Sequence, residues 1–441
     1  MTERKLPTGW ARTTLGELGQ WFGGGTPSKR NPEFWESGTI PWLSPKDMGA
    51  SLLVDTRDRI TEAAVAGSAT SLVPANSVAL VVRSGILERK VPISLVPFET
   101  TLNQDMKAVV PHTGVDPKWL LYILQSQEQA ILHGCRKSGT TVASLDTAKL
   151  YGLPILLPPL TEQHRMVEVL EDYFSRLDAA DSGVRSAVAR TSNLISSSHK
   201  SALSGTDNGD SVRIGDIAKV GSGATPLRGN AQYYNGGTIP WATSGDLHAG
   251  DIFDVPGRIT EAALRETAVK LWPAGTLLVA MYGEGRTRGT VAELHIASTT
   301  NQACAAIVLH SEFAGLKRWV RFILRTRYDE MRSQASGGVQ PNLSLGRIKE
   351  IPIPMPDVEI RNAILTEDEA NSEAVDRLRL AGEQSLARST ALRRSLLRAA
   401  FSGELVDQDP TDEPAAVTLA RIRAQQSGIK PRPRRKVVVA K

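Results

Sequence analysis

The spacing of apolar residues predicts a long helix near the middle of the chain. No proline occurs between Thr161 and Gly205, and apolar or small residues recur there every seven positions in two interleaved rows. The first row is Met166, Tyr173, Ala180, Ala187 and Leu194, and the second is Leu170, Leu177, Val184, Thr191 and Ser198. A 3.5-residue period over about five heptads is typical of a helix that packs against another helix. About 40 residues would form a rod of roughly 60 Å.

The partner of this helix is predicted in the same chain. The two rows are rich in Ala, Ser and Thr, so one helix alone would bury little apolar surface. The pattern recurs, in a more polar form, 198 residues later at Ile364, Asp368, Asn371, Val375, Leu378, Gly382, Ser385, Ser389, Leu392, Leu396 and Ala399. The closing words KSALSG (200–205) and RAAFSG (398–403) also correspond. The alternative is an amphipathic helix that lies on its own domain.

The whole chain contains an internal duplication. GTIPW occurs at 38–42 and again at 237–241, and RITEAA occurs at 59–64 and at 258–263. Asn103-Gln104 corresponds to Asn301-Gln302. Matched words in the same order over half a chain predict two copies of one structural unit.

Each copy is predicted to be a loop-rich block followed by a long helix. LVPANSVALVV and LWPAGTLLVAM are typical of a turn and a buried strand, and DPKWLLYILQSQEQAIL and GLKRWVRFILRTRYDEM of amphipathic helices. The predicted fold class is therefore α+β: two mixed α/β domains in tandem, joined by two long antiparallel helices with pseudo-twofold symmetry. This topology returns the C-terminus to the N-terminus. The predicted segments are 1–160, 161–205, 206–356, 357–404 and a C-terminal tail, 405–441.

Composition limits the cellular setting and the chemistry. The 441 residues carry a formal charge of +5. Because six basic residues lie in the terminal stretch 430–441, the rest of the chain is close to neutral. Any nucleic-acid surface on the blocks must therefore arise from local clustering of charge. No apolar run has membrane-spanning length and no secretory segment follows Met1, so we expect a soluble cytoplasmic protein. The two cysteines, Cys135 and Cys304, lack a CxxC or Cys/His neighbourhood, which favours reduced thiols and no metal site.

Loops that differ between the two copies are the best candidates for recognition. They follow Thr26-Pro27 and Thr225-Pro226, the two GTIPW words and the two central strands. Their candidate DNA-binding residues are Lys29, Arg30, Lys46, Arg83, Arg89, Lys90, Arg228, Asn230, Tyr233, Ser244, Tyr282, Arg286 and Arg288. Arg and Lys can bind guanine edges or phosphates, and Asn can pair with adenine. Each residue taken alone is equally well explained as a solvated surface group.

Words shared by both copies favour structural roles instead. Trp42 and Trp241 are expected in the core, and Asn103-Gln104 and Asn301-Gln302 are expected to make hydrogen bonds within the fold. Catalytic motifs are absent: there is no GxxxxGK[ST], GxSxG or HExxH. Asp105, Lys107 and Glu99 distantly suggest a nuclease metal site, but the second copy has Ala303 and Ala305 at the matching positions.

Two unlike blocks and two matching helices resemble the specificity subunit of type I restriction–modification systems. KLPTGWARTTLGEL is similar to the family's opening, and GTIPW, TTNQA, SGGVQPNLSL, IPIPMP, AAFSGELV and DPTDEPAAVTLARIRA are similar to its recurrent words. The first block departs from the family pattern at TTVASLD, where the second has GVQPNLS.

The resemblance implies a non-catalytic protein whose blocks are target-recognition domains, each reading half of a split, asymmetric site in double-stranded DNA. It also implies that the helices bind two methyltransferase subunits, which two restriction and motor subunits join. S-adenosylmethionine, ATP and magnesium would belong to those partners, and this chain would carry no cofactor. The exposed charges of the first helix, Arg176 and Arg185 among them, are predicted to bind the partner.

Two other functions stay open at this point. One is an autonomous DNA-modifying enzyme with an unrecognised active site, and the other is a structural scaffold that does not bind DNA. Methylation or cleavage of DNA by the isolated chain would establish the first, and the lack of salt-sensitive DNA binding would favour the second.

Overall fold

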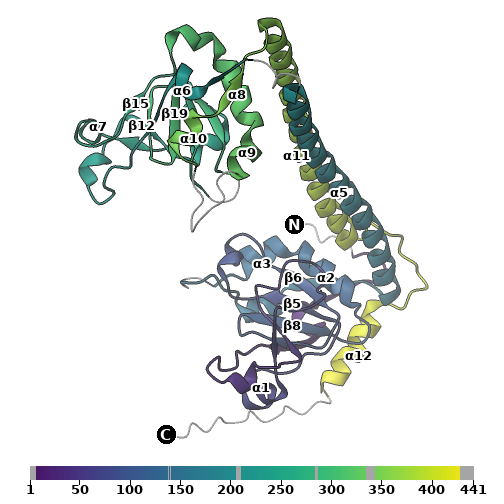
Figure 1. Ribbon diagram of the computed structural model, residues 1–441. Coiled ribbons are helices and arrows are strands. Elements are labelled where there is room, and N and C mark those ends of the chain that lie inside the picture. The colour runs from purple at the N-terminus through teal and green to yellow at the C-terminus, as the bar shows by residue number, and fades with distance from the viewer. Residues whose placement is uncertain are drawn as a thin grey trace, which may run out of the picture. The chain divides into compact units, whose positions relative to one another are not determined.

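The protein is described by a computed structural model (Figure 1), which covers residues 6–137, 139, 141–204, 210–283, 287–333 and 343–427. The chain forms two compact units, Met1–Gly183 with Gln384–Lys441, and Val184–Glu383. Each unit holds one globular block and parts of both long helices. We call the blocks block 1 (residues 6–157) and block 2 (residues 210–354). The five predicted segment boundaries stay a prediction.

Block 1 is built on an antiparallel sheet. Its strands are β1 (Ala11–Thr14), β2 (Gly19–Gly23), β3 (Ile40–Leu43), β4 (Asp58–Ile60), β5 (Ser77–Val81), β6 (Ile93–Val96), β7 (Thr101–Leu102), β8 (Met106–Pro111) and β9 (Pro154–Leu157). Its helices are α1 (Glu62–Gly67), α2 (Pro117–Ser126), α3 (Glu128–Gly134) and α4 (Thr147–Tyr151). The main sheet has the order β2-β8-β5-β6, a second has β4-β3-β7, and β1 pairs with β9.

The core of block 1 lies between the main sheet and α2, which packs along the sheet (Figure 1). Trp119 and Leu120 of α2 are buried against Val78, Leu80 and Val109 of the sheet. The helix starts at Asp116, whose side chain accepts a hydrogen bond from the Trp119 amide at 2.8 Å, and Pro117 occupies the first helical position. The helix predicted for this stretch is confirmed in its first part, but it ends at Ser126 and a separate helix, α3, begins at Glu128.

Block 2 repeats this construction. Its strands are β10 (Ser211–Arg213), β11 (Ala218–Ser222), β12 (Ile239–Ala242), β13 (Asp251–Ile252), β14 (Arg258–Ile259), β15 (Leu271–Trp272), β16 (Leu277–Ala280), β17 (Val291–Leu294), β18 (Ser298–Thr300), β19 (Cys304–Leu309) and β20 (Pro352–Pro354). Its helices are α6 (Ile214–Ile217), α7 (Glu261–Glu266), α8 (Lys317–Thr326), α9 (Tyr328–Ser333) and α10 (Leu345–Lys349). The orders β11-β19-β16-β17-β13 and β14-β12-β18-β15 match those of block 1, with one short strand added to each sheet.

The repeated words have the same structural roles in both blocks. The threonine of RITEAA caps the helix that follows: Thr61 accepts from the Ala64 amide at 3.2 Å, and Thr260 from the Ala263 amide at 3.3 Å. The tryptophan of GTIPW donates its indole N–H to a backbone carbonyl, that of Gly25 for Trp42 and that of Ala224 for Trp241. Trp42 is buried and Trp241 is partly buried. The internal duplication is therefore a duplication of fold.

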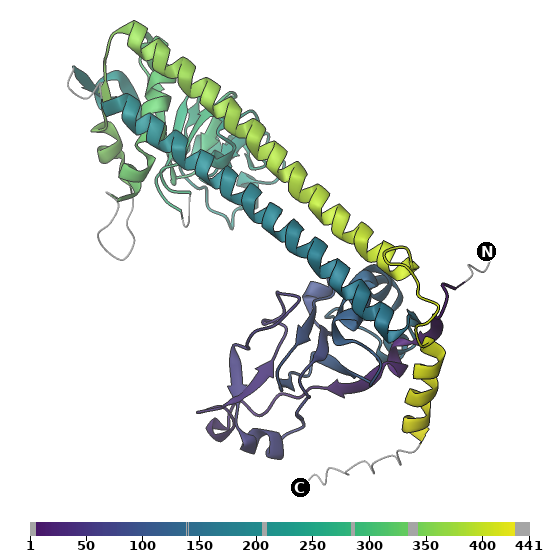
Figure 2. The ribbon, with the colours of Figure 1, turned by 90° about the vertical axis from the view of Figure 1, so that its right-hand side faces the viewer.

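The two long helices are α5 (Leu160–Ser204) and α11 (Val358–Ser402), each of 45 residues. In the first unit, Asp181 of α5 lies beside Ser389 and Arg393 of α11. In the second unit, Val184 and Val188 of α5 lie beside Gly382 of α11. Partner numbers fall along α11 as they rise along α5, so the helices are antiparallel, as predicted, and Figure 2 shows them side by side.

One of the two predicted rows on α5 is wrong by one residue at Tyr173 and Ala180. Leu177, Val184 and Thr191 of the other row are partly buried as expected, and so is Ala187, but Tyr173 is 43% exposed and Ala180 is exposed. The second contact row consists of Phe174, Asp181 and Val188, each one residue later than predicted. Met166 and Leu170 are buried in the core of block 1, so the first turns of α5 also satisfy the alternative of a helix lying on its own domain. The side chains of Leu194 and Ser198 lie outside the described residues.

The same shift occurs on α11. Gly382 and Ser389 are buried as predicted, whereas Leu378 and Leu392 are exposed and Ser385 faces solvent. Leu386 and Arg393, one residue after Ser385 and Leu392, are partly buried in their place. A seven-residue recurrence allows two sets of contact positions. From Leu170, steps of three and then four residues lead to Tyr173 and Leu177, whereas steps of four and then three lead to Phe174 and Leu177. The apolar character of Tyr173 and Leu392 favoured the wrong order.

The C-terminal segment folds back onto block 1. Helix α12 (Ala415–Ser427) begins where the Ala415 amide donates to the Gly9 carbonyl at 2.9 Å. Arg423 of α12 pairs with Glu17 at 3.1 Å, and Arg165 of α5 pairs with Asp412 at 2.6 Å. The predicted return of the chain to its beginning is confirmed up to residue 427. The basic stretch 430–441 lies outside the described residues. No helix in the described ranges is long and apolar enough to span a membrane.

Candidate nucleic-acid interface

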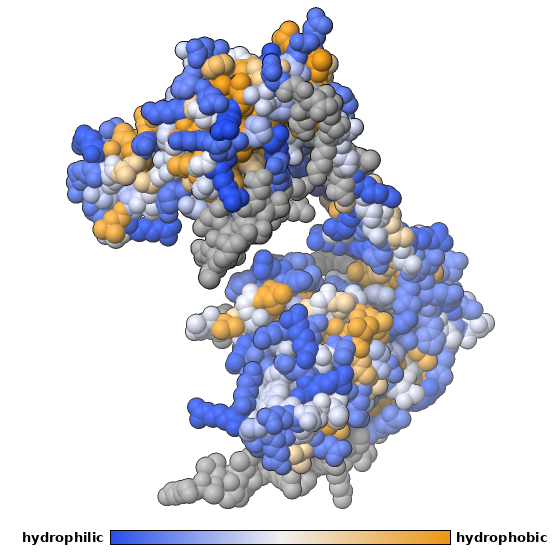
Figure 3. Space-filling model, viewed as in Figure 1, coloured by the Kyte–Doolittle hydropathy of each residue, from blue (hydrophilic) through white to orange (hydrophobic). Residues whose placement is uncertain are grey.

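The variable loops of block 1 present basic side chains to solvent. Lys29 and Arg30 are exposed in the loop that follows β2. The next residue, Asn31, accepts a hydrogen bond from the Glu33 amide at 3.2 Å and thereby fixes the end of that loop. Lys46 is exposed at the tip of a turn, which Asp47 closes by accepting from the Ser44 amide at 2.9 Å. In the face shown in Figure 3, hydrophilic side chains predominate on the surfaces of the blocks.

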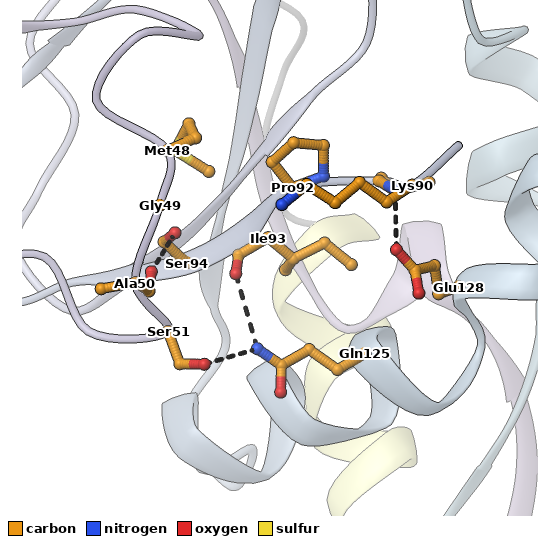
Figure 4. Close-up of a pocket in the computed structure, with 11 residues that line it drawn as sticks. Met48, Gly49, Ala50, Ser51, Lys90, Pro92, Ile93, Ser94, Gln125 and Glu128 are labelled. Carbon is orange, nitrogen blue, oxygen red and sulfur yellow. Dashed lines mark hydrogen bonds between the residues drawn. The ribbon is translucent and has the colours of Figure 1, made fainter. Parts of the chain in front are cut away.

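A pocket of about 310 Å³ separates two of these loops in block 1 (Figure 4). Gln125 donates to the Ser51 hydroxyl at 3.1 Å, and Ser94 donates to the Ala50 carbonyl at 2.6 Å. Glu128 accepts from the Val91 amide at 2.8 Å, next to Lys90. These hydrogen bonds join the two loop segments to neighbouring helices. Segment 48–51 is bonded to α2, and the backbone that follows the loop 83–90 is bonded to α3. Gln125 and Glu128 were missed by sequence reasoning, since helical periodicity does not reveal which loop a polar side chain supports.

Arg83 and its neighbours line a second, basic pocket of about 610 Å³. Its wall includes Arg83 shortly after β5, Lys107 on β8 and Lys137 before α4. Arg83 pairs with Asp105 at 2.8 Å. This ion pair engages the Asp105 carboxylate, which a nuclease-like metal site would need as a ligand. Arg89, which lies in the same loop 83–90, is exposed.

The counterparts in block 2 are partly engaged within the fold. Asn230 accepts from the Gln232 amide at 3.1 Å, as Asn31 does in block 1, and the Tyr233 hydroxyl donates to Glu266 at 3.3 Å. Arg228 and Tyr282 are exposed, whereas Ser244 and Arg288 are partly buried. Arg286 lies outside the described residues. The assignment of these side chains to DNA contact stays a prediction, and for Asn230 and Tyr233 a structural role is already present.

The shared Asn-Gln words frame the same corner of each block. Asn103 accepts from the Asp105 amide at 2.7 Å, and Asn301 accepts from the Ala303 amide at 3.1 Å. Thr26 bonds to Gln104, and Thr225 bonds to Gln302 in the same way. The expected hydrogen-bonding role of these words within the fold is confirmed.

An acidic cluster on block 2 is neutralised by neighbouring cations. Ligand-type atoms of Asp251, Glu293 and His295 lie within 4.8 Å of one another. Arg321 contacts Asp251 at 2.8 Å, and Lys317 contacts Glu293 at 2.6 Å. Burial by itself would raise the pKa of Asp251, but hydrogen bonds from Arg321 and His295 outweigh it and hold that pKa below its ordinary value. These ion pairs account for the cluster without a metal ion.

The candidate partner-binding residues lie on the exposed surface of α5. Arg176 is 73% exposed and pairs with Asp172, one turn earlier, at 2.9 Å. Arg185 is also exposed. Exposed pairs of this kind add little stability. Both arginines are therefore available to another molecule.

Each unit ties its block to a long helix by an equivalent ion pair. Lys118 of α2 contacts Glu171 of α5 at 2.7 Å, and Arg318 of α8 pairs with Glu369 of α11. Two copies of one block, each attached in the same way to one of two antiparallel helices, define the class of protein: a tandem repeat of block and long helix.

The chain belongs to the family of the type I restriction modification DNA specificity domain, whose model matches residues 7–182 and 207–377. It is similar to the type I restriction enzyme EcoR124I/EcoR124II specificity subunit of Escherichia coli, with 48% identity over 171 residues, which is 39% of this chain and 42% of that subunit. The MjaIX specificity subunit of Methanocaldococcus jannaschii is 25% identical over 299 residues, 64% of this chain and 68% of that protein.

Two solved structures share the fold. A chain of a type I R-M system aligns with a TM-score of 0.70 and 18% identity, over 91% of this chain and 100% of its own length. The HsdS subunit from Thermoanaerobacter tengcongensis aligns with a TM-score of 0.50 and 18% identity, over 92% of this chain and 99% of its own. At this level of identity the similarity concerns the fold. The α+β architecture with long antiparallel helices is thus common to these proteins.

Proposed function

We propose that this chain is the non-catalytic DNA sequence-specificity subunit of a type I restriction–modification enzyme, and that each block reads one half of a split, asymmetric DNA site. The observation that carries the proposal is a shared frame with unlike loops. The turn closed by Asp47 in block 1 is closed by Asp246 in block 2, which accepts from the Thr243 amide at 2.7 Å. The tips of the two turns nevertheless differ in sequence.

This combination suits the reading of DNA sequence. A rigid frame is needed to hold side chains against base edges, and different bases need different donors and acceptors. Lys29, Arg30 and Lys46 of block 1 supply donors only, whereas Asn230, Tyr233 and Ser244 of block 2 can also accept hydrogen bonds. Arg83, Arg89 and Lys90 extend the donor set of block 1, and Arg228, Tyr282, Arg286 and Arg288 complete that of block 2.

We further propose that the exposed faces of α5 and α11 bind two methyltransferase subunits, which two restriction and motor subunits join. Two equivalent helices offer two equivalent surfaces for two copies of one partner. S-adenosylmethionine, ATP and magnesium would then act in those partners. Arg176 and Arg185 supply positive charge on the α5 surface.

Exchange of loops tests the DNA half of this proposal. The loops 28–35, 44–48 and 83–90 of block 1 are replaced by those of a relative, and methylated positions are mapped in cells that carry the variant and the partner subunits. One half-site should change and the other should persist, because block 2 is untouched. A simultaneous change of both half-sites would show that one block does not serve one half-site.

Charge reversal tests the partner half. The double variant Arg176→Glu and Arg185→Glu should co-purify less methyltransferase subunit while retaining the wild-type unfolding temperature. A matched control reverses two exposed charges on block 2, Arg265 and Lys270, away from the long helices. Equal recovery of the partner with both double variants would contradict a role for this surface of α5.

A further inference from the structure

The basic pocket of block 1 contains a lysine whose charge is not balanced within the fold. Lys107 lies on β8 opposite Gly23 of β2. Its ammonium is 5.8 Å from the centre of the Tyr151 ring. The side chain is partly buried, and within the described ranges no carboxylate forms an ion pair with it.

Burial without an anionic partner is unfavourable for an ammonium group. The half-buried position lowers the pKa of Lys107 through desolvation. The contact with the Tyr151 ring compensates for only part of the lost hydration. A binding partner that supplies hydrogen-bond acceptors would compensate for the rest.

The other charged groups make the pocket positive. Asp105, next to Lys107, is already paired with Arg83 at 2.8 Å. Lys137 follows Arg136, which forms an isolated β-bridge with Leu145, and the Lys137 amide donates to the Ser144 carbonyl at 2.9 Å. Arg83, Lys107 and Lys137 therefore line a space of about 610 Å³, which accommodates groups larger than a single ion.

Comparison with block 2 separates the frame of this pocket from its variable wall. The frame, Gln104 bonded to Thr26, recurs as Gln302 bonded to Thr225. The wall does not recur: Tyr282 stands at the place of Arg83, and Ala305 at the place of Lys107. The DNA backbone is chemically the same in both half-sites, whereas the bases differ. A difference confined to the wall therefore favours contact with bases.

We propose that Lys107, together with Arg83, reads hydrogen-bond acceptors on a base edge in the half-site bound by block 1. Both side chains only donate, and guanine presents the acceptors O6 and N7 together in the major groove. Lys107 is thus a specificity-determining residue for guanine, outside the loops that diverge most in sequence. This inference rests on the proposed function and names the residue that reads one base.

The test uses the full-length chain assembled with its partner subunits. Methylated sites are mapped for the wild type and for Lys107→Met, which keeps the length of the side chain and removes the charge. Discrimination at one guanine of the block 1 half-site should fall by about tenfold or more. The block 2 half-site should stay unchanged. Lys107→Arg, which retains donors, should restore the preference for guanine.

A matched control removes the same charge elsewhere on block 1. Lys118→Met breaks the ion pair with Glu171 of α5, outside the lining of the basic pocket, and should leave both half-sites unchanged. Thermal unfolding of each variant shows that the blocks stay folded, and the arginine variant keeps the test valid if the methionine variant does not fold.

Three results would overturn the inference. One is a block 1 half-site without guanine on either strand. Another is unchanged discrimination in Lys107→Met. The last is uniformly weaker binding to every sequence with a salt slope reduced by about one, which would identify a phosphate contact. Absence of sequence-specific methylation in the wild type would instead refute the proposed function itself.

Discussion

The hydroxyl of Ser389 on α11 donates a hydrogen bond to the carboxylate of Asp181 on α5 at 3.1 Å, so a polar pair occupies the contact between the two long helices. Arg393, one turn further along α11, approaches Asp181 at 3.4 Å and the more exposed Asp178 at 2.8 Å. The contact is therefore specified by matched polar groups as well as by apolar packing.

Loss of the Asp181 carboxylate should weaken the helix pair. Asp181→Ala leaves Ser389 without its acceptor and removes one of the two carboxylates that Arg393 contacts, and we expect a loss of about 1–3 kcal/mol. The matched control is Asp172→Ala on the same helix. This change breaks only the exposed pair with Arg176 and should cost less than about 0.5 kcal/mol. Denaturant unfolding followed by circular dichroism measures both, and equal effects would refute a structural role for Asp181.

Two glycines in the long helices should respond differently to the same substitution. A Cβ atom at Gly183 would meet nothing within 4 Å, so Gly183→Ala should stabilise the chain by about 0.5–1 kcal/mol through helix propensity. At Gly382 the added atom would lie 3.1 Å from Val188 and 3.3 Å from Val184. The gain from Gly382→Ala should therefore be cancelled.

The larger change Gly382→Leu should destabilise the chain by about 1–3 kcal/mol, because the helices would have to move apart. Differential scanning calorimetry distinguishes the three variants. If Gly382→Ala stabilises as much as Gly183→Ala, the close approach of the helices at Gly382 is not required.

The attachment of the C-terminal segment should depend on pH. The hydrogen bond from Arg165 is the main cause that holds the pKa of Asp412 below its ordinary value of 3.8. A depressed pKa means that the folded chain favours the carboxylate. The contribution is therefore fully present well above pH 3.8 and is lost as the pH falls through the lower pKa of the folded state.

Asp412→Asn should cost about 1–2 kcal/mol at neutral pH, since Arg165 is partly exposed, and the difference from wild type should disappear towards pH 3.8 and below. Unfolding temperatures across this range measure the effect. In the double variant with Arg165→Met the second change should add little. A difference that stays constant down to the acid limit would exclude this ion pair as its origin.

The two cysteines should be inert in the native chain. Cys135 and Cys304 are buried and free. Burial raises the pKa of Cys304 to about 12 and also raises that of Cys135. Because the thiolate is the reactive form, a thiol reagent at about pH 8 should label neither residue until the chain is denatured. Rapid labelling of the folded chain would indicate that one of the blocks opens.

Much of the candidate interface could be predicted from sequence because it consists of exposed loops. Lys29, Arg30 and Lys46 are exposed as expected, since charged residues between turn signals seldom become buried. Lys107 illustrates the limit of this reasoning. It lies in the strand word DMKAVVP, and only the pairing of β8 with β2 places it opposite Gly23 and beside the pocket. Gln125 and Glu128 were missed for the same reason, because their partners are distant in sequence.

The sequence by itself determined the duplication, the two blocks and the existence of two long helices. Each of these features follows from local sequence signals, namely repeated words, strand and helix periodicity, and helix caps. Caps such as Thr61 and Thr260 bond to amides only three residues away. The tertiary structure decided which residues of the helices meet. Tyr173 and Phe174 fit a seven-residue recurrence equally well, and Phe174 packs inward, where its ring meets Tyr122 of block 1 and Arg393 of α11. Contact phase, ion pairs and pockets depend on the surface that a distant segment presents, and local periodicity carries no information about that surface.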